Sequence, residues 1–240
     1  MKKIFLLSSC LFSFLTVFAQ NTEGVITFEE KMNLHRRIQN EEMKARIPEF
    51  RSNNMELIFR GDECMYKAID EEEDEEANAG GGVRMMFRRP NVEIYRNYAT
   101  SKRVEQRDMM DKKYLIETDI KQTAWKLGTE TKKILGYECT QATFNDTARK
   151  QELVAWFTMD LPLTAGPQNY GSLPGMILEL DINKGEVVIM AKKIDLKKVK
   201  DTAIKAPSKG DKITEEELKQ KRDEMMKRNG GGPNMRIIRQ

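Results

Sequence analysis

Histidine is almost absent from this sequence, which has a single one, His35, among its 240 residues. Nucleophilic catalysis usually needs a general base such as histidine, and Cys/His zinc sites need several such ligands. The chain also contains no GxSxG, HExxH or P-loop motif. These absences argue against the common hydrolase, zinc and nucleotide-binding classes, and we predict a protein without enzymatic activity, metal or cofactor.

Long apolar runs are limited to the N-terminus. Two lysines precede the apolar run from Ile4 to Phe18, and the small residue Ala19 follows it. This pattern is typical of a secretory signal peptide, here predicted over residues 1–19. An alternative is a lipoprotein box that ends at Cys10. We therefore predict an exported protein of the periplasm or outer-membrane surface, without a transmembrane span after signal cleavage.

Cysteine is scarce, and removal of the signal peptide would leave only Cys64 and Cys139. An even pair in an oxidising compartment makes a disulfide between them possible. The alternative is two buried free thiols, because unpaired cysteine packs as a small hydrophobe.

The charge is high but balanced. Lysine and arginine number 41, aspartate and glutamate 38, and the formal net charge of +3 falls to +1 when Lys2 and Lys3 leave with the signal peptide. No basic stretch dominates the chain, so the composition gives no reason to expect a nucleic-acid partner.

Two-residue alternation is the dominant pattern after the signal peptide. In GVITFEEKMNLH, Ile26 and Phe28 share one parity and polar residues take the other, as in a half-buried strand. Similar short runs, separated by glycine, proline, asparagine or aspartate, continue along the chain. We predict a mainly β protein over residues 20–200, built as a single curved antiparallel sheet resembling a half-barrel or open barrel. The acidic and glycine-rich loop 70–90 is predicted to be flexible.

The C-terminal part has a helix signal. Thr214 is an N-cap candidate with Glu217 three residues later, which is the spacing of a capping box. We predict that residues 201–240 form a linker, one helix and a flexible tail.

Aromatic residues suggest a ligand-binding face. If the sheet is curved, these residues are predicted to line its concave side: Trp125, Tyr137, Trp156, Tyr170 and Leu173. A half-open antiparallel sheet of this kind could carry a lipid-like or apolar ligand. The alternative interpretation is that the aromatic cluster is core.

Glu179 and Asp181 are the paired carboxylates of the chain. They are two residues apart in an apolar run, so they share one face of the expected strand. Paired carboxylates can act as general acid and base in a hydrolase. The plain alternative is a strand of the core with polar residues on its outer face.

The stretch GPQNYGSLPGMILEL contains two turns before a strand begins. Gly166-Pro167 is a turn signal, and Pro174-Gly175 is a type II turn candidate. These residues are interpreted as a crossover between two strands, with apolar residues that pack as a plug.

This stretch, together with KKILGYECTQATF and VAWFTMDLP upstream, resembles the GLPGLI family of exported Bacteroidetes proteins. Among the residues that match the family's motifs are Gly166, Pro167, Leu173, Pro174, Gly175 and Ile177. Ser172 stands where the motif has its first glycine. The resemblance implies an exported protein without an established activity, and it supplies no catalytic residue. We therefore predict a non-enzymatic cell-envelope binding or accessory module for an outer-membrane or periplasmic partner.

Overall fold

The computed structural model describes residues 23–38, 40–69, 91–109, 112–161 and 163–228. The predicted signal peptide, the predicted flexible loop 70–90 and the predicted tail from residue 229 lie outside the described residues. The strands are β1 (Glu23–Asn33), β2 (Phe50–Arg60), β3 (Glu63–Ala68), β4 (Val92–Asn97), β5 (Lys102–Met109), β6 (Lys112–Asp119), β7 (Lys126–Ile134), β8 (Tyr137–Asp146), β9 (Gln151–Thr158), β10 (Met176–Ile182), β11 (Val187–Asp195) and β12 (Asp211–Lys212). The helices are η1 (His35–Arg37), α1 (Glu41–Lys44) and α2 (Glu215–Arg228).

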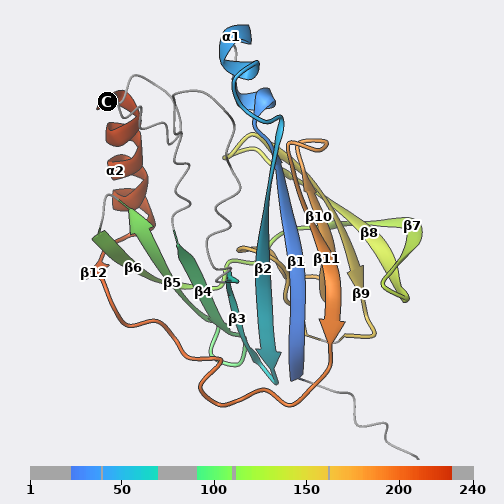
Figure 1. The fold of residues 1–240 in the computed structure, drawn as a ribbon. Coiled ribbons are helices and arrows are strands. Elements are labelled where there is room, and N and C mark those ends of the chain that lie inside the picture. The colour runs from blue at the N-terminus through green and yellow to red at the C-terminus, as the bar shows by residue number, and fades with distance from the viewer. Residues whose placement is uncertain (1–22, 39, 70–90, 110–111, 162, 229–240) are drawn as a thin grey trace, which may run out of the picture.

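The twelve strands of the described residues belong to one open sheet, in the order β12-β6-β5-β4-β3-β2-β1-β11-β10-β9-β8-β7. Figure 1 shows the sheet curving from β7 at one edge to β12 and helix α2 at the other. Neighbouring strands are antiparallel at every position except the β12–β6 edge. The prediction of a mainly β fold with one curved antiparallel sheet and a C-terminal helix is therefore confirmed.

The sheet continues beyond residue 200, where the sequence predicts that the β domain ends. Asp211 and Lys212 pair in parallel with Tyr114 and Leu115 of β6, and the backbone N–H of Ile213 donates to the carbonyl of Leu115 at 3.0 Å. Two residues are too few to show the alternation from which strands are recognised in a sequence. The segment after β11 thus returns to the sheet before α2 begins.

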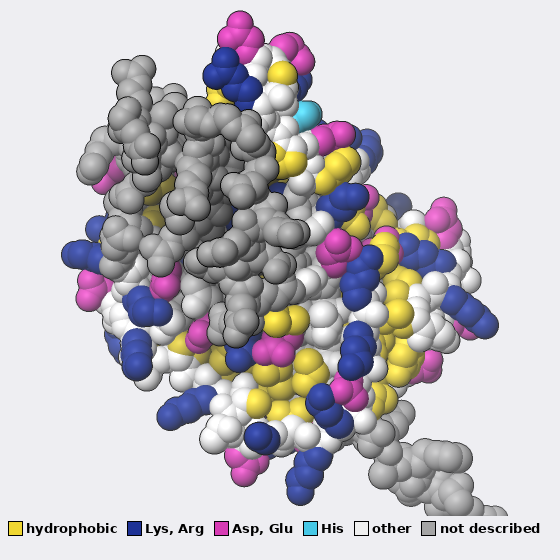
Figure 2. Space-filling view, viewed as in Figure 1, with side chains coloured by type: hydrophobic (Ala, Val, Ile, Leu, Met, Phe, Trp, Pro, Cys, Tyr) yellow, Lys and Arg dark blue, Asp and Glu magenta, His cyan; other side chains and the backbone are white. Residues whose placement is uncertain are grey.

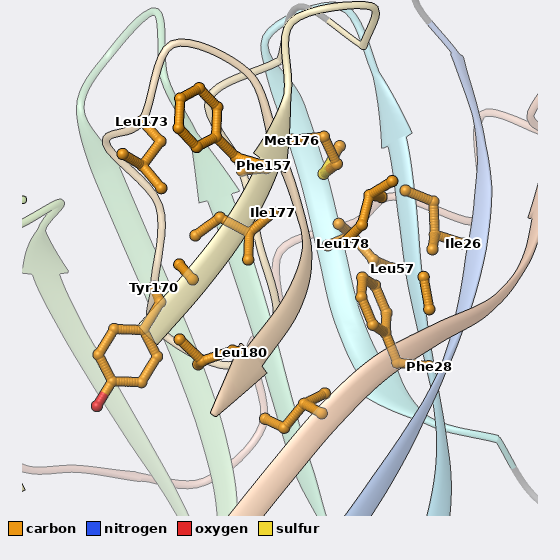
Figure 3. Close-up of a cluster of buried hydrophobic side chains, with 14 of the residues drawn as sticks. Ile26, Phe28, Leu57, Phe157, Tyr170, Leu173, Met176, Ile177, Leu178 and Leu180 are labelled. Atoms are coloured by element: carbon orange, nitrogen blue, oxygen red, sulfur yellow. The ribbon is translucent and has the colours of Figure 1, made fainter. Parts of the chain in front are cut away.

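The core lies on the inner face of the curved sheet. The even-numbered residues of β1 from Gly24 to Glu30 are buried, which is the alternation that the sequence predicts. Figure 3 shows side chains from β1, β2, β9 and β10 packed together with Tyr170 and Leu173 from the segment between β9 and β10. The labelled residues are Ile26, Phe28, Leu57, Phe157, Tyr170, Leu173, Met176, Ile177, Leu178 and Leu180, all of them buried.

A smaller apolar cluster covers part of the outer face. Ile58 of β2 and Met65 of β3 pack there against Val199 and Ile204 from the segment that leads to β12. This packing explains why the segment returns to the sheet, because burying its two aliphatic side chains stabilises the crossing.

The two described cysteines are free and buried. Cys64 lies on β3 and Cys139 on β8, and five strands separate β3 from β8 in the sheet. The possible disulfide is therefore absent, and the alternative of two buried free thiols describes the pair. Sequence distance carried no information on this point, because the strand order decides which cysteines meet.

Helix α2 begins as the sequence predicts. The backbone N–H of Glu217 donates to Thr214 Oγ1 at 3.1 Å, and the Thr214 N–H donates to Glu217 Oε2 at 2.7 Å. This is the reciprocal capping box. None of the helices in the described ranges is long and apolar enough to cross a membrane.

Candidate functional site

The aromatic residues predicted to line one face lie on both faces of the sheet. The ring of Trp125 packs edge-on against Phe144 at 5.8 Å and Tyr170 at 6.4 Å between ring centroids. Phe144 is paired across the strands with Leu153, a buried residue of the inner face. Trp125 and Tyr170 therefore belong to the core side, where Leu173 is 1% exposed.

Trp156 and Tyr137 lie on the opposite face. Trp156 stands between the core residues Ala155 and Phe157 along β9, and adjacent residues of a strand point to opposite sides. Gln141 is the cross-strand partner of Trp156, and Tyr137 has the same parity as Gln141 on β8. The five predicted ligand residues thus do not form one concave surface, because they lie on both faces of the sheet. The segment between β9 and β10 also fills the inner face.

A row of side chains crosses the outer face from β1 to β9. Glu29 pairs with Met190, Met190 with Glu179, and Glu179 with Trp156. Lys192 forms an ion pair with Glu29 at 2.8 Å, and its hydrogen bond is the main cause that lowers the pKa of Glu29 below its ordinary value. Figure 2 shows the resulting mixture of basic, acidic and apolar side chains over β1 and β11.

Lys132 of β7 joins this row to the edge of the sheet. Its Nζ donates to both carboxylate oxygens of Glu179 at 2.7 Å and lies 4.3 Å from the centroid of the Trp156 ring. The Glu179 side chain is 12% exposed and that of Lys132 is 35% exposed. A cation shared between a carboxylate and an aromatic face is held in place by both contacts.

An open groove lies beside this ion pair. It has a volume of 410 Å³, which falls within the range of about 300–1,000 Å³ typical of ligand pockets. Its lining residues are Lys132, Lys133, Ile134, Leu135, Glu179, Met190, Ala191 and Lys192. Leu135, at the turn between β7 and β8, is 48% exposed. The groove therefore offers apolar contact surface surrounded by charged groups, which suits binding.

The paired carboxylates are both engaged in structural contacts. They share the outer face, as predicted, but Glu179 is bound to Lys132 and Asp181 Oδ1 accepts a hydrogen bond from the Gly185 N–H at 2.7 Å. Asp181 thereby closes the turn between β10 and β11. This arrangement gives no support to a hydrolase that uses the two carboxylates together.

Cys139 is close to the groove but is not a reactive thiol. Burial raises its pKa to about 11, and its Sγ lies 3.7 Å from the Tyr137 carbonyl oxygen, to which the thiol donates. The thiolate, not the thiol, is the nucleophile and metal ligand. No cluster of three or more metal-ligating side chains occurs among the described residues.

A second depression lies beside η1 and α1, where the β1–β2 connection extends beyond the sheet. It is larger, at 730 Å³, and is lined by Asn33, His35, Arg36, Ile38, Lys44 and Glu49. Nε2 of His35 lies 3.0 Å from the Ile47 carbonyl oxygen. This contact joins the two ends of the connection between β1 and β2, so the imidazole ring has a structural role. The outer groove is the better candidate because it adjoins Trp156 and Glu179.

The stretch that carries the motif lies between β9 and β10 and packs against the inner face of the sheet. A Cβ atom added to Gly166 would lie 2.8 Å from Ile177 Cβ, and one added to Gly171 would lie 2.6 Å from the Thr164 carbonyl oxygen. Glycine is therefore required for close packing at both positions. Pro167 and Gly175 are buried as well, whereas Pro174 is exposed. The stretch is architecture, as interpreted from its turn residues.

Ser172, which replaces the first glycine of the motif, has a φ of +68°. Its Oγ accepts a hydrogen bond from the Thr123 N–H at 3.3 Å, which partly offsets the cost of the left-handed backbone. We expect Ser172→Ala to lower the free energy of unfolding by about 1 kcal/mol, because it removes the acceptor and keeps the strain. Ser172→Gly removes both and should leave stability within about 0.5 kcal/mol of the parent. Urea unfolding of the three proteins tests this, and an alanine variant as stable as the glycine variant would contradict it.

Sequence reasoning missed most of the groove. Lys132 and Leu135 were not singled out, since a lysine in a strand and a leucine in a turn are common features of exposed hairpins. The one available signal is the parity of Lys132 with the buried Ile134, which places the ammonium group on the half-covered side of β7.

The family described as N-glycanase peptide, N-terminal domain, matches residues 84–220, more than half of the sequence. The chain belongs to this family. Two structures of PNGF-II, solved in different space groups, share the fold of this family member with a TM-score of 0.56 and 16% sequence identity. The alignments cover 83% and 82% of this chain and 32% of the PNGF-II chain. The family member therefore spans about a third of the length of PNGF-II, and no curated protein matches it. These comparisons do not test the GLPGLI resemblance, which stays a prediction.

Proposed function

We propose that this chain is a non-enzymatic exported module that binds a periplasmic or outer-membrane partner through the outer groove. The observation that carries this proposal is the contrast between the two faces. The inner face is filled by the crossover, whereas the outer groove presents the exposed Leu135 beside lysines. Exposed apolar groups within a charged rim are typical of contact surfaces.

Membership of the N-terminal domain family supports an accessory role. The match corresponds to about a third of PNGF-II, so a fold of this kind is one part of a longer chain there. Export is supported by the N-terminal apolar run and by the GLPGLI resemblance. We therefore place the module in the cell envelope, next to a partner that supplies the activity.

The two alternatives have less support. An apolar carrier needs an open inner face, but Tyr170 and Leu173 are 6% and 1% exposed within the core. A hydrolase needs free carboxylates, but Glu179 is bound by Lys132 and Asp181 closes a turn.

A matched pair of leucine variants tests the binding proposal. We expect Leu135→Asp to weaken binding of the envelope partner about tenfold or more, because a carboxylate would be placed in an apolar contact. Leu127→Asp is the control, since Leu127 is 58% exposed but does not line the groove. The measurement is site-specific photo-crosslinking from positions 135 and 127 in intact envelopes, followed by affinity measurement with the captured protein. Equal crosslinking or equal affinity for both variants would reject the groove as the binding surface.

The absence of enzymatic activity has its own test. Because the family is named for N-glycanases, the purified chain should be incubated with an N-glycosylated peptide and the products followed by mass spectrometry. We expect no glycan release. Release that disappears in Glu179→Gln would replace the proposal with the hydrolase alternative.

A further inference from the structure

Charged side chains occupy the core-facing side of β4 and β5. Arg103 and Glu105 are two residues apart on β5 and therefore share one face of the strand. Arg103 lies directly across from Arg96 on β4. Arg96 is 2% exposed and Arg103 is 8% exposed. Like charges at opposed strand positions repel each other, and burial limits the screening of that repulsion by salt. Such a pair requires anions nearby.

The anions that the described residues supply do not balance the cations. Glu105 forms ion pairs with Arg103 and with Arg107, and Glu215 forms ion pairs with Arg103 and with Lys121. The cations of this group are Arg96, Arg103, Arg107 and Lys121. Four cations and two carboxylates leave a net charge of +2 (4 − 2) for the group.

One of the two carboxylates comes from a weakly attached element. Glu215 is the first residue of α2, and none of the side chains of residues 215–225 is buried. Besides the contacts of Glu215, Lys221 Nζ lies 5.9 Å from the centroid of the Tyr114 ring. Helix α2 is therefore attached through half-buried side chains, which include Leu218 and Met225, and through partly exposed charge contacts, which are individually weak.

The Glu215 carboxylate itself is held as an anion. Burial raises its pKa, but hydrogen bonds from Lys121 and Arg103 lower it by more, so that the pKa lies below its ordinary value. The Arg103 Nη1 atom donates to Oε1 at 2.8 Å while Lys121 binds Oε2. One carboxylate bridged by a guanidinium and an ammonium group is the geometry of a carboxylate receptor.

Neutral groups surround the same arginine. Arg103 Nε donates to Asn169 Oδ1 at 2.9 Å, and Nη1 also donates to Thr118 Oγ1 at 3.2 Å. In these contacts the amide and the hydroxyl act as acceptors, so the Asn169 NH₂ and the Thr118 O–H remain as donors. Donors beside a carboxylate receptor suit a ligand that carries both a carboxylate and hydroxyl groups.

We propose that Arg103 and Lys121 form a binding site for the carboxylate of a hydroxylated acid, such as a sugar acid, and that Glu215 occupies this site until the ligand displaces it. The site is on the inner side of β5, away from the outer groove, and does not depend on the function proposed above. The displacement is limited to α2, because β12 and the Ile213 N–H remain paired with β6. Removal of the internal competitor therefore raises the apparent affinity without opening the sheet.

The test measures binding of D-glucuronate by calorimetry, with D-glucose and acetate as probes that each carry one half of its chemistry. Glu215→Gln should bind glucuronate about fivefold or more tightly than the parent chain, since the competing carboxylate is gone. Adding Lys121→Ala to that variant should abolish the gain, whereas adding Lys102→Ala should keep it. Lys102 is a matched control because it is an exposed lysine of β5 that pairs with Asp119 instead.

A second measurement separates a ligand site from a purely structural ion pair. Saturating glucuronate should speed hydrogen exchange of the α2 amides in the parent chain, because the ligand replaces the contact that holds the helix. Unchanged exchange, or no gain in affinity for Glu215→Gln with an unaltered circular dichroism spectrum, would overturn the proposal. Acetate binding as tight as that of glucuronate would overturn the proposed ligand class, and glucose binding as tight as that of glucuronate would overturn the carboxylate site.

Discussion

Replacing Gly175 with alanine is expected to destabilise the chain by about 3–5 kcal/mol, a large part of the stability of a typical domain. Gly175 has a φ of +149°, and a Cβ atom there would lie 2.0 Å from the carbonyl oxygen of Thr158. Thr158 cannot move aside easily, because it is paired with Met176 in the β9–β10 ladder. Both backbone strain and steric overlap therefore act against the variant. Urea unfolding followed by circular dichroism measures the loss.

Gly185→Ala is the control for backbone strain alone. Gly185 has a φ of +90°, but a Cβ atom there would meet nothing within 4 Å. This variant should lose only about 1 kcal/mol. If the variants at Gly175 and Gly185 lose the same small amount, the close approach of the crossover to Thr158 is not what makes glycine necessary.

Removal of the Arg96 guanidinium group is the second change with a large expected effect. Its Nη2 donates to the Gly166 carbonyl at 2.7 Å and its Nη1 donates to the Tyr170 carbonyl at 3.0 Å. Both acceptors belong to buried residues of the crossover. Arg96→Met keeps much of the side-chain volume but leaves two carbonyl groups without these donors. Each unsatisfied buried group costs about 1–3 kcal/mol.

An opposing effect reduces this loss. Arg96 is buried beside Arg103, and its Nε atom has no hydrogen-bond partner among the described residues, so methionine also removes a repulsion and a desolvation cost. We expect the lost hydrogen bonds to dominate and the free energy of unfolding to fall by about 2–4 kcal/mol. Arg60→Met is the control, since Arg60 pairs at the surface with a 96% exposed Asp201 side chain and should contribute less than about 1 kcal/mol.

The measurement for this pair is again urea unfolding, with near-ultraviolet circular dichroism to report on the packing around Trp125 and Tyr170. Loss of the near-ultraviolet signal with retained strand content would show that the crossover has detached from the sheet. An Arg96→Met variant as stable as the parent chain, or more stable, would contradict this prediction. It would show that the free-energy cost of burying the guanidinium group is at least as large as the stabilisation from its two hydrogen bonds.

Much of the fold was predictable because it depends on local chemistry. The parity of Ile26 and Phe28 indicated a half-buried strand, and Thr214 with Glu217 indicated the start of a helix. Both signals act over a few residues, where backbone geometry relates sequence spacing directly to direction. The short strand β12 has no such signal, because it is held by its place beside β6.

The candidate site was predictable only in part. The sequence points to Glu179 and Trp156, but its prediction of a single face for the aromatic set is wrong, because Trp156 and Trp125 lie on opposite faces. Parity within one strand is readable from a sequence, whereas the relative phase of two strands depends on their register and on bulges. The register shift between Leu127 and Thr131 of β7, just after Trp125, is one such irregularity.

The sequence by itself determined the strand-rich architecture, the helix cap and the turn chemistry of the crossover, because each follows from the conformational preferences of neighbouring residues. Only the tertiary structure decided that Lys132 binds Glu179, that Arg96 holds the crossover and that Cys64 and Cys139 stay apart. The physical reason is that these contacts join residues far apart in the chain. Their partners are selected when the whole sheet curves to bury its apolar face, and no local pattern encodes that choice.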